Sequence, residues 1–162
     1  MNVSRFFAFA AAVAAVSIAL PAGAQTQPAL SPTAQRALAE VREFIAAFNA
    51  GDVPRMIATC APRASIIDDI PPHEWHGSDA CGQWARDLAA SEKKAGISDG
   101  VVTLGTAWRV DVDGPWAYVV SPATYTYRMH GKPVTASNSI FTLALERIGG
   151  TWRITGWAWS AR

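Results

Sequence analysis

Two adjacent carboxylic acids, Asp68 and Asp69, follow a short run rich in isoleucine and precede a Pro-Pro break. A carboxyl group at the end of a buried strand beside a cavity can accept a proton or anchor a ligand, so these two are the candidate catalytic residues. Successive side chains of a strand point to opposite faces, so we expect at most one of the two to face a cavity. In the alternative interpretation, one carboxylate is solvated and the other caps the turn before Pro71.

His73 and His76 follow, with Glu74 and Asp79 nearby. A His-x-x-His spacing in a loop offers two metal ligands, whereas convincing sites bring together three or four. Surface or loop-capping histidines are therefore the better interpretation, and we expect neither a metal nor a cofactor. In a catalytic interpretation, a tyrosine or His73 polarises a substrate from which Asp68 removes a proton.

Aromatic and amide side chains supply the candidate lining of a small-molecule pocket. Tyr125 and Tyr127 lie on one predicted strand and share a face if no bulge separates them. Pro122 leaves the register of that strand open, so these tyrosines either line a pocket or pack at an interface between sheets. The expected pocket residues are Phe44, His73, Trp75, Tyr125, Tyr127 and Asn138.

The first 24 residues have the pattern of a secretory signal peptide. Arg5 gives a positive start, residues 6–20 are apolar or small, and Ala22-Gly23-Ala24 is an Ala-x-Ala cleavage pattern. The apolar run, about 15 residues, is shorter than the ~20 that a membrane-spanning helix needs, which disfavours the alternative of a membrane anchor. We therefore expect cleavage after Ala24, a periplasmic or secreted protein, and no membrane association after cleavage.

The chain has only two cysteines, Cys60 and Cys81, and the expected export would place both in an oxidising compartment. An even number of cysteines in an oxidising compartment favours a disulfide. The bridge would close a loop of about 20 residues and stabilise the fold by ~3 kcal/mol. The alternative is two small buried thiols in unrelated core positions.

Charge excludes one class of partner. The chain has 14 basic and 13 acidic side chains, and loss of Arg5 with the signal peptide makes these numbers equal. No basic run or patch interrupts this balance, so we expect no nucleic-acid partner. No nucleophile motif, phosphate-binding glycine loop or dinucleotide fingerprint is present either.

Hydrophobic spacing predicts one α+β domain over residues 32–162, after a flexible leader over 25–31. Apolar residues at helical spacing predict a helix that starts at Pro32 and stops near Gly51, a second short helix that Pro62 ends, and a third from Gly77. A first strand is expected over 64–68. Alternating residues and turn signals then predict four consecutive strands, which start near Val101, Trp116, Val134 and Thr151. A curved, mainly antiparallel sheet wrapped around three helices commonly leaves a conical cavity.

Seven tryptophans are many for so small a chain. Trp84 and Trp152 lie at expected core positions. Trp75 is an expected pocket residue, and the other four tryptophans are expected on the outer face of the sheet. Exposed apolar surface of this kind marks an association site, so we expect a homodimer. These four are Trp108, Trp116, Trp157 and Trp159.

Segments 44–52, 64–69, 75–77 and 150–154 together resemble the nuclear-transport-factor-2-like superfamily, in particular its SnoaL-like and ketosteroid-isomerase-like branches. The resemblance covers nearly all of the chain after the predicted signal peptide and implies the conical fold. The superfamily includes isomerases, cyclases, dehydratases, epoxide hydrolases and binding domains, so the resemblance does not fix a function.

The ketosteroid isomerase branch implies specific residues. Its proton-transferring carboxylate matches Asp68, but its oxyanion-binding tyrosine on the first helix matches Phe44. No carboxylate lies between Val134 and Leu145, where the second donor would stand. Loss of even one such donor typically costs ~3 kcal/mol of barrier, so authentic ketosteroid isomerase activity is not expected.

Three functions remain open at this point. The first is a binding domain for a small apolar or aromatic molecule. The second is a cofactor-independent isomerase or lyase with Asp68 as general base. The third is a structural or protein-interaction domain whose cone is packed solid.

Overall fold

The computed structural model describes residues 29–161. The predicted signal peptide, 1–24, and most of the predicted leader lie outside the described residues. Helices and strands follow in the order α1 (Pro32–Asn49), α2 (Val53–Ala58), β1 (Cys60–Ile67), β2 (Glu74–Ser78), α3 (Ala80–Ala95), β3 (Ile97–Leu104), β4 (Arg109–Asp113), β5 (Trp116–Met129), β6 (Lys132–Ile148) and β7 (Thr151–Ser160).

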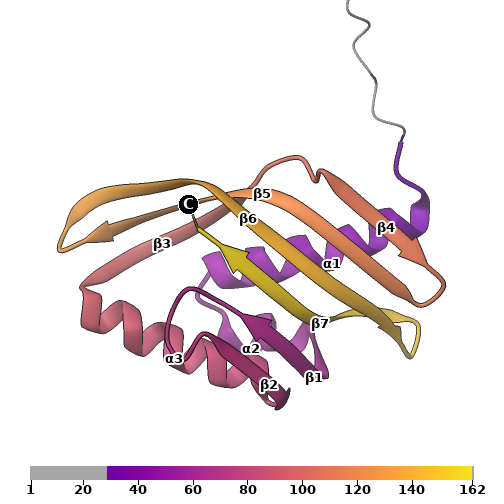
Figure 1. Ribbon diagram of the computed structural model, residues 1–162, viewed down its shortest axis with the longest axis horizontal. Coiled ribbons are helices and arrows are strands. Elements are labelled where there is room, and N and C mark those ends of the chain that lie inside the picture. Colours follow the sequence, from indigo (N-terminus) through magenta and orange to yellow (C-terminus); the bar gives the residue numbers. More distant parts are fainter. Residues whose placement is uncertain (1–28, 162) are drawn as a thin grey trace, which may run out of the picture.

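The strands form one sheet in the order β2-β1-β7-β6-β5-β3, and β4 also pairs with β5. The β1–β7 pair is parallel and the others are antiparallel. Figure 1 shows the sheet arching over α1 and α3, with the β1–β2 hairpin beside α3. The predicted α+β architecture, a curved sheet over three helices, is confirmed.

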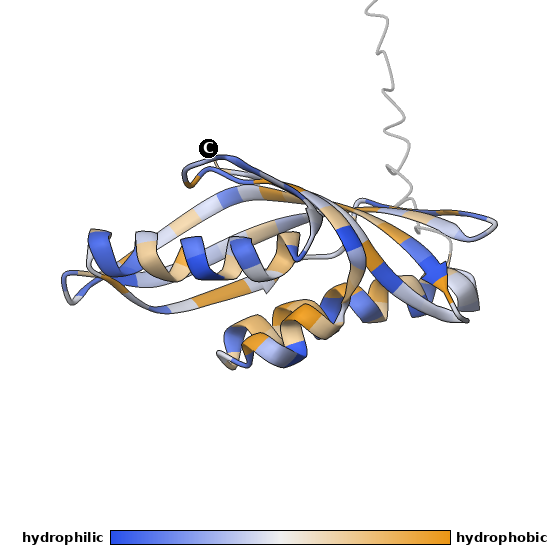
Figure 2. Cartoon of the chain, turned by 90° about the horizontal axis from the view of Figure 1, so that it is seen from below, coloured by the Kyte–Doolittle hydropathy of each residue, from blue (hydrophilic) through white to orange (hydrophobic). Residues whose placement is uncertain are grey.

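Helix α1 is the main element covered by the sheet. The Ser31 hydroxyl accepts a hydrogen bond from the Ala34 amide at 3.2 Å, and Pro32 occupies the first turn, as a capped helix start requires. Leu38, Val41 and Phe44 lie at helical spacing and are buried. Figure 2 shows hydrophobic residues alternating with hydrophilic ones along the helices, as expected where one face packs on a sheet.

The structure has two more strands than the sequence predicted. Residues 74–78 form β2, a short edge strand in which Trp75 is the only buried residue. Its polar composition gave no strand signal, and α3 therefore starts at Ala80 rather than at Gly77. The single strand expected after Val101 is divided into β3 and β4 by the segment 105–108.

The first strand also starts earlier than expected, at Cys60, and contains Pro62. Proline lacks a backbone N–H, so it is tolerated in a strand where the ladder is irregular. The β1–β7 register shifts between Cys60 and Ser65, which places Pro62 in such an irregular stretch.

Two bulges decide which side chains face inward. In β6 the four residues Ala136 to Ser139 span the same length as the three residues Ala123 to Tyr125 of β5, and Asn138 has a positive φ of 68°. In β7 the register with β6 shifts at Thr155. Each bulge adds one residue and so reverses the alternation of faces beyond it.

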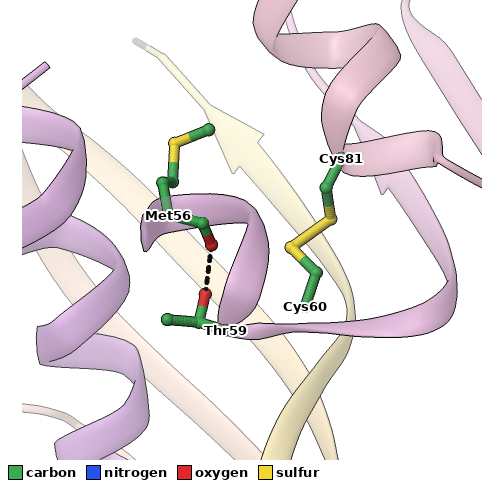
Figure 3. Close-up of a disulfide and its surroundings, with 4 residues drawn as sticks. All are labelled: Met56, Thr59, Cys60 and Cys81. Atoms are coloured by element: carbon green, nitrogen blue, oxygen red, sulfur yellow. Dashed lines mark hydrogen bonds between the residues drawn. A yellow bond between two sulfur atoms is a disulfide. The ribbon is translucent and has the colours of Figure 1, made fainter. Parts of the chain in front are cut away.

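The predicted disulfide is confirmed: Cys60 and Cys81 are bonded. The bond joins the first residue of β1 to the first turn of α3, across a sequence separation of 21 (Figure 3). Beside it, the Thr59 hydroxyl donates to the Met56 carbonyl at 2.7 Å and closes α2. The covalent link therefore fixes the start of α3 against the sheet.

Candidate functional site

A cavity of about 330 Å³ lies between the inner face of the sheet and helices α1 and α3. Eight of its twenty lining residues are aromatic. The rings on the lining come from both helices and from β5, β6 and β7, and they belong to Phe44, Phe48, Trp84, Tyr125, Tyr127, Phe141, Trp157 and Trp159. A volume in this range and an apolar wall with a few polar groups are typical of small-molecule sites, which span ~300–1,000 Å³.

The phenylalanine and tryptophan rings form one continuous cluster. Phe44 on α1 lies 5.0 Å from Trp157 between ring centroids, and Trp84 meets Trp157 edge-to-face at 5.1 Å. Phe141 lies 5.6 Å from Trp159, also edge-to-face. Such contacts hold rings in preferred geometries, so the wall is built before any ligand enters.

Asp68 is the most buried carboxyl group on this lining. It follows the last residue of β1, and only 9% of it is exposed. Its Oδ2 accepts a hydrogen bond from the Trp84 indole at 3.0 Å, and its Oδ1 accepts one from the Ile70 amide at 3.4 Å. The carboxyl group is therefore held by α3 and by the turn that follows β1.

The surroundings of Asp68 raise its pKa to about 7. Burial is the largest cause, because it penalises the charged form, and the adjacent Asp69 carboxyl group raises the pKa further. The Trp84 indole and the Ile70 amide act in the opposite direction. Asp68 can therefore exchange a proton near neutral pH.

Asp69 also lines the cavity, which corrects the expectation that at most one of the two carboxylates would do so. That expectation assumed a strand through both residues. Instead β1 ends at Ile67 and the chain turns at once, so the two side chains are not forced to opposite faces. Asp69 is exposed and Asp68 is buried, so they stand at different depths in the same opening.

A second polar group on the lining joins α3 to β5. The Tyr125 hydroxyl donates to Glu92 Oε1 at 2.6 Å, and the Tyr127 ring stacks on the Tyr125 ring at 4.9 Å. Burial, and then the hydrogen bond to Glu92, raise the pKa of Tyr125, so its hydroxyl remains a donor. Both tyrosines line the cavity, because Pro122 stays in register with Ile140 and β5 alternates without interruption.

Ser139 on β6 carries an unpartnered hydroxyl. The residue is 1% exposed, lies on the cavity lining, and its Oγ has no hydrogen-bond partner among the described residues. Buried polar atoms are nearly always paired, so this oxygen calls for a partner from a ligand or solvent.

Three expected pocket residues do not line the cavity. The Trp75 ring is buried between β2 and α3, where its indole donates to Asp87 at 2.8 Å. His73 is exposed, and its Nδ1 lies 3.2 Å from the main-chain oxygen of Asp68. Asn138 is exposed because the β6 bulge turns it away and places Ser139 inward. Of the expected pocket residues, the structure brings together Phe44, Tyr125 and Tyr127.

Several lining residues were not predicted as part of a pocket. Trp157 and Trp159 were expected on the outer face, but the β7 bulge turns them inward. Glu92 lies in a charged stretch of α3 that reads as a solvated helix end. Of these four residues, only Trp84 was predicted to be buried, because it lies at helical spacing on α3. That spacing indicated a core position rather than a cavity wall.

The charges on the lining are all of one sign. Within residues 29–161, the cavity lining includes Asp68, Asp69 and Glu92 but no lysine, arginine or histidine. The described part of the chain also holds no group of three metal-ligating side chains. None of its helices is long and apolar enough to cross a bilayer.

Comparison with protein families identifies this architecture. A model of the SnoaL-like domain matches residues 38–161. The chain belongs to the SnoaL-like domain family. The expected family resemblance is thereby confirmed, and the curved sheet over three helices is the fold of this SnoaL-like domain.

Solved structures agree with this assignment at the level of the fold. A ketosteroid isomerase-like protein from Erwinia carotovora atroseptica is 20% identical, with a TM-score of 0.65, over 82% of this chain and 98% of that one. A nuclear-transport-factor-2-like superfamily protein from Salmonella enterica serovar Typhimurium is 16% identical, with a TM-score of 0.66, over 79% and 89%. A protein of the same kind with a cystatin-like fold, from Novosphingobium aromaticivorans, is 13% identical, with a TM-score of 0.63, over 78% and 80%. A search of curated proteins found no match.

Proposed function

We propose that this SnoaL-like domain is an exported binding protein for a small molecule with an apolar or aromatic body. The observation that carries the proposal is the cavity of about 330 Å³ whose lining includes eight aromatic side chains. Contact between such rings and an apolar ligand releases water from both surfaces. The disulfide between Cys60 and Cys81 is compatible with an oxidising compartment and supports the exported part of the proposal.

Tryptophan fluorescence tests the binding function directly, because Trp84, Trp157 and Trp159 line the cavity. A panel of aromatic and aliphatic metabolites should contain compounds that change this emission and raise the melting temperature. Ala136→Trp, which puts a large ring on the lining, should abolish both effects. Thr135→Trp is the matched control, since its exposed side chain is the neighbouring one on β6. No response from any compound would contradict the proposal.

The exported location has its own test. Expression of the full chain in a bacterium should yield a periplasmic or secreted form whose first residue is Gln25. A cytoplasmic protein that retains residues 1–24 would contradict export.

A cofactor-independent isomerase or lyase is the second candidate, and Asp68 is the observation that favours it. A carboxyl group with a pKa raised to about 7 is suited to accept a proton at neutral pH. The first helix, however, offers the Phe44 ring where a ketosteroid isomerase has a tyrosine donor, and the β6 residues on the lining are Ala136, Ser139 and Phe141. In this mechanism Asp68→Asn abolishes turnover while ligand binding persists; equal turnover by the variant would exclude it.

An interaction domain with a solid cone is the least supported candidate, because the cone contains open space. Self-association is compatible with a ligand-binding function. Trp116 and Tyr118 on the outer face of β5 are 53% and 44% exposed. We propose that this outer face joins two copies of the chain.

A further inference from the structure

We propose that the cavity selects organic cations, in particular amines attached to an aromatic or apolar body. This inference rests on the proposed binding function and adds the chemical class of the ligand. It comes from three independent features of the lining: the sign of its charges, its aromatic wall and its unpartnered hydroxyl group.

The first feature is the one-sided charge. The lining includes three carboxyl groups, from Asp68, Asp69 and Glu92, and no basic side chain within residues 29–161. Lys93 and Lys94 follow Glu92 on α3, but both are exposed and neither is on the lining. Because aromatic walls exclude water, a charge placed in the cavity interacts more strongly with these groups than it would in solution. A ligand anion is repelled and a ligand cation is attracted.

The second feature is the aromatic wall itself. The face of an indole or phenyl ring carries negative partial charge and attracts a cation within about 6 Å of its centre, with tryptophan the strongest. Three of the seven tryptophans, Trp84, Trp157 and Trp159, line this one cavity. The same rings contact the apolar body of the ligand, so one wall recognises both parts of an aromatic amine.

The third feature is the Ser139 hydroxyl group, which is independent of the charges. Its oxygen is buried on the lining without a partner among the described residues. A hydroxyl oxygen accepts hydrogen bonds, and an ammonium group brings up to three donors. A ligand amine therefore satisfies the one fully buried side-chain atom of the lining that has no partner among the described residues.

Binding of a cation is coupled to the ionisation of Asp68. The polar groups that contact its carboxyl group are Asp69, the Trp84 indole and the Ile70 amide, and none of them carries a positive charge. His73 approaches only the main-chain oxygen of Asp68. A bound ammonium favours the ionised carboxylate, so binding below neutral pH releases a proton, and affinity rises with pH.

Three probes of one shape test the inference: naphthylmethylamine, naphthylmethanol and naphthoate, which are cationic, neutral and anionic. Isothermal titration calorimetry of the intact protein should find the amine bound about tenfold or more tighter than the alcohol, and the acid weakest. Between about pH 5.5 and about pH 7.5, affinity for the amine should rise several-fold while affinity for the alcohol stays constant.

Two variants test whether the preference for the amine arises from Asp68 in the cavity. Asp68→Asn should lower the affinity for the amine about tenfold and leave that for the alcohol unchanged. Asp113→Asn, at an exposed site on β4, should change neither. The pH dependence of the unaltered protein gives the same information if Asp68→Asn does not fold.

The outcomes separate the two proposals. Equal binding of the amine and the alcohol, or preferred binding of the acid, overturns the selection of cations and leaves the binding function standing. Absence of binding by all three probes and by the wider metabolite panel overturns both.

Discussion

The indole nitrogen of Trp84 donates a hydrogen bond to Oδ2 of Asp68 at 3.0 Å. This contact joins the first part of α3 to the end of β1, and the disulfide between Cys60 and Cys81 joins the start of α3 to the start of β1. The disulfide and the hydrogen bonds from the Trp84 indole and the Ile70 amide therefore fix the position of the buried carboxyl group. The protonation of Asp68 depends on the balance between burial, which raises its pKa, and the Trp84 indole, which lowers it.

Trp84→Phe should raise the pKa of Asp68 above its present value of about 7. The phenyl ring keeps most of the apolar contact but removes the donor that favours the charged carboxylate. The measurement is a carboxyl-carbon NMR titration of Asp68. Trp152→Phe is the control, because Trp152 is buried but is not on the cavity lining. A lower pKa in Trp84→Phe would show that the indole does not stabilise the anion.

Asp68→Asn should stabilise the fold at alkaline pH. The pKa of Asp68 is raised in the folded state, so its neutral form is favoured there. Between the unfolded value of 3.8 and about 7, the unfolded chain loses this proton first, and the stability of the native protein falls as the pH rises. Asparagine avoids this loss and still offers an oxygen to the Trp84 indole.

Urea unfolding checks this prediction at two pH values. At about pH 8 the variant should be more stable by on the order of a few kcal/mol, and near pH 4 the difference should nearly vanish. Asp113→Asn provides the baseline for loss of an exposed carboxylate. A stability difference that is independent of pH would contradict the assigned pKa shift.

Much of the architecture follows from the sequence because long periodic segments dominate it. The α1 stripe of Leu38, Val41 and Phe44 and the alternation of β5 each determine an element without reference to the rest of the chain. β2 could not be predicted, because an edge strand of five residues with one buried side chain gains its stability from pairing with β1 and not from its own pattern.

The cavity lining was harder to predict than the fold, for one physical reason. A bulge adds a residue whose position no local pattern reveals, and it reverses the faces of all residues beyond it. The β7 bulge moves Trp157 from the expected outer face to the cavity. The β6 bulge places Ser139, and not Asn138, on the cavity lining. Phe44 and Asp68 needed no such information, since the helical period and the strand end already placed them.

Replacing both cysteines should destabilise the protein substantially. The bond closes a loop between residues 21 apart, and the entropy that it removes from the unfolded chain corresponds to ~3 kcal/mol. Cys60→Ser with Cys81→Ser should therefore unfold at a much lower urea concentration, and reduction of the unaltered protein should have a similar effect. Unchanged stability after both treatments would mean that the bond does not constrain the unfolded state.

Gly156→Ala should open the junction between β1 and β7. A Cβ atom at this position would overlap the main-chain oxygen of Ser65, which belongs to the neighbouring strand and cannot rotate away. Overpacking of this kind typically costs ~1–3 kcal/mol. The measurements are urea unfolding and amide exchange of β1. Ala158→Ser is the control, two residues further along β7. Protection of β1 equal to that of the unaltered protein would contradict the close approach.

Tyr118→Glu should convert the proposed dimer to a monomer. Tyr118 and Trp116 alternate with the buried Ala117 and Val119, so their side chains point to the outer face of β5. A charge buried at an interface between two apolar surfaces has no compensating partner, so association is lost. Analytical ultracentrifugation at micromolar concentration should find a dimer for the unaltered protein and for Val53→Glu, whose side chain is exposed on α2, and a monomer for Tyr118→Glu. A monomeric unaltered protein would refute association through this face.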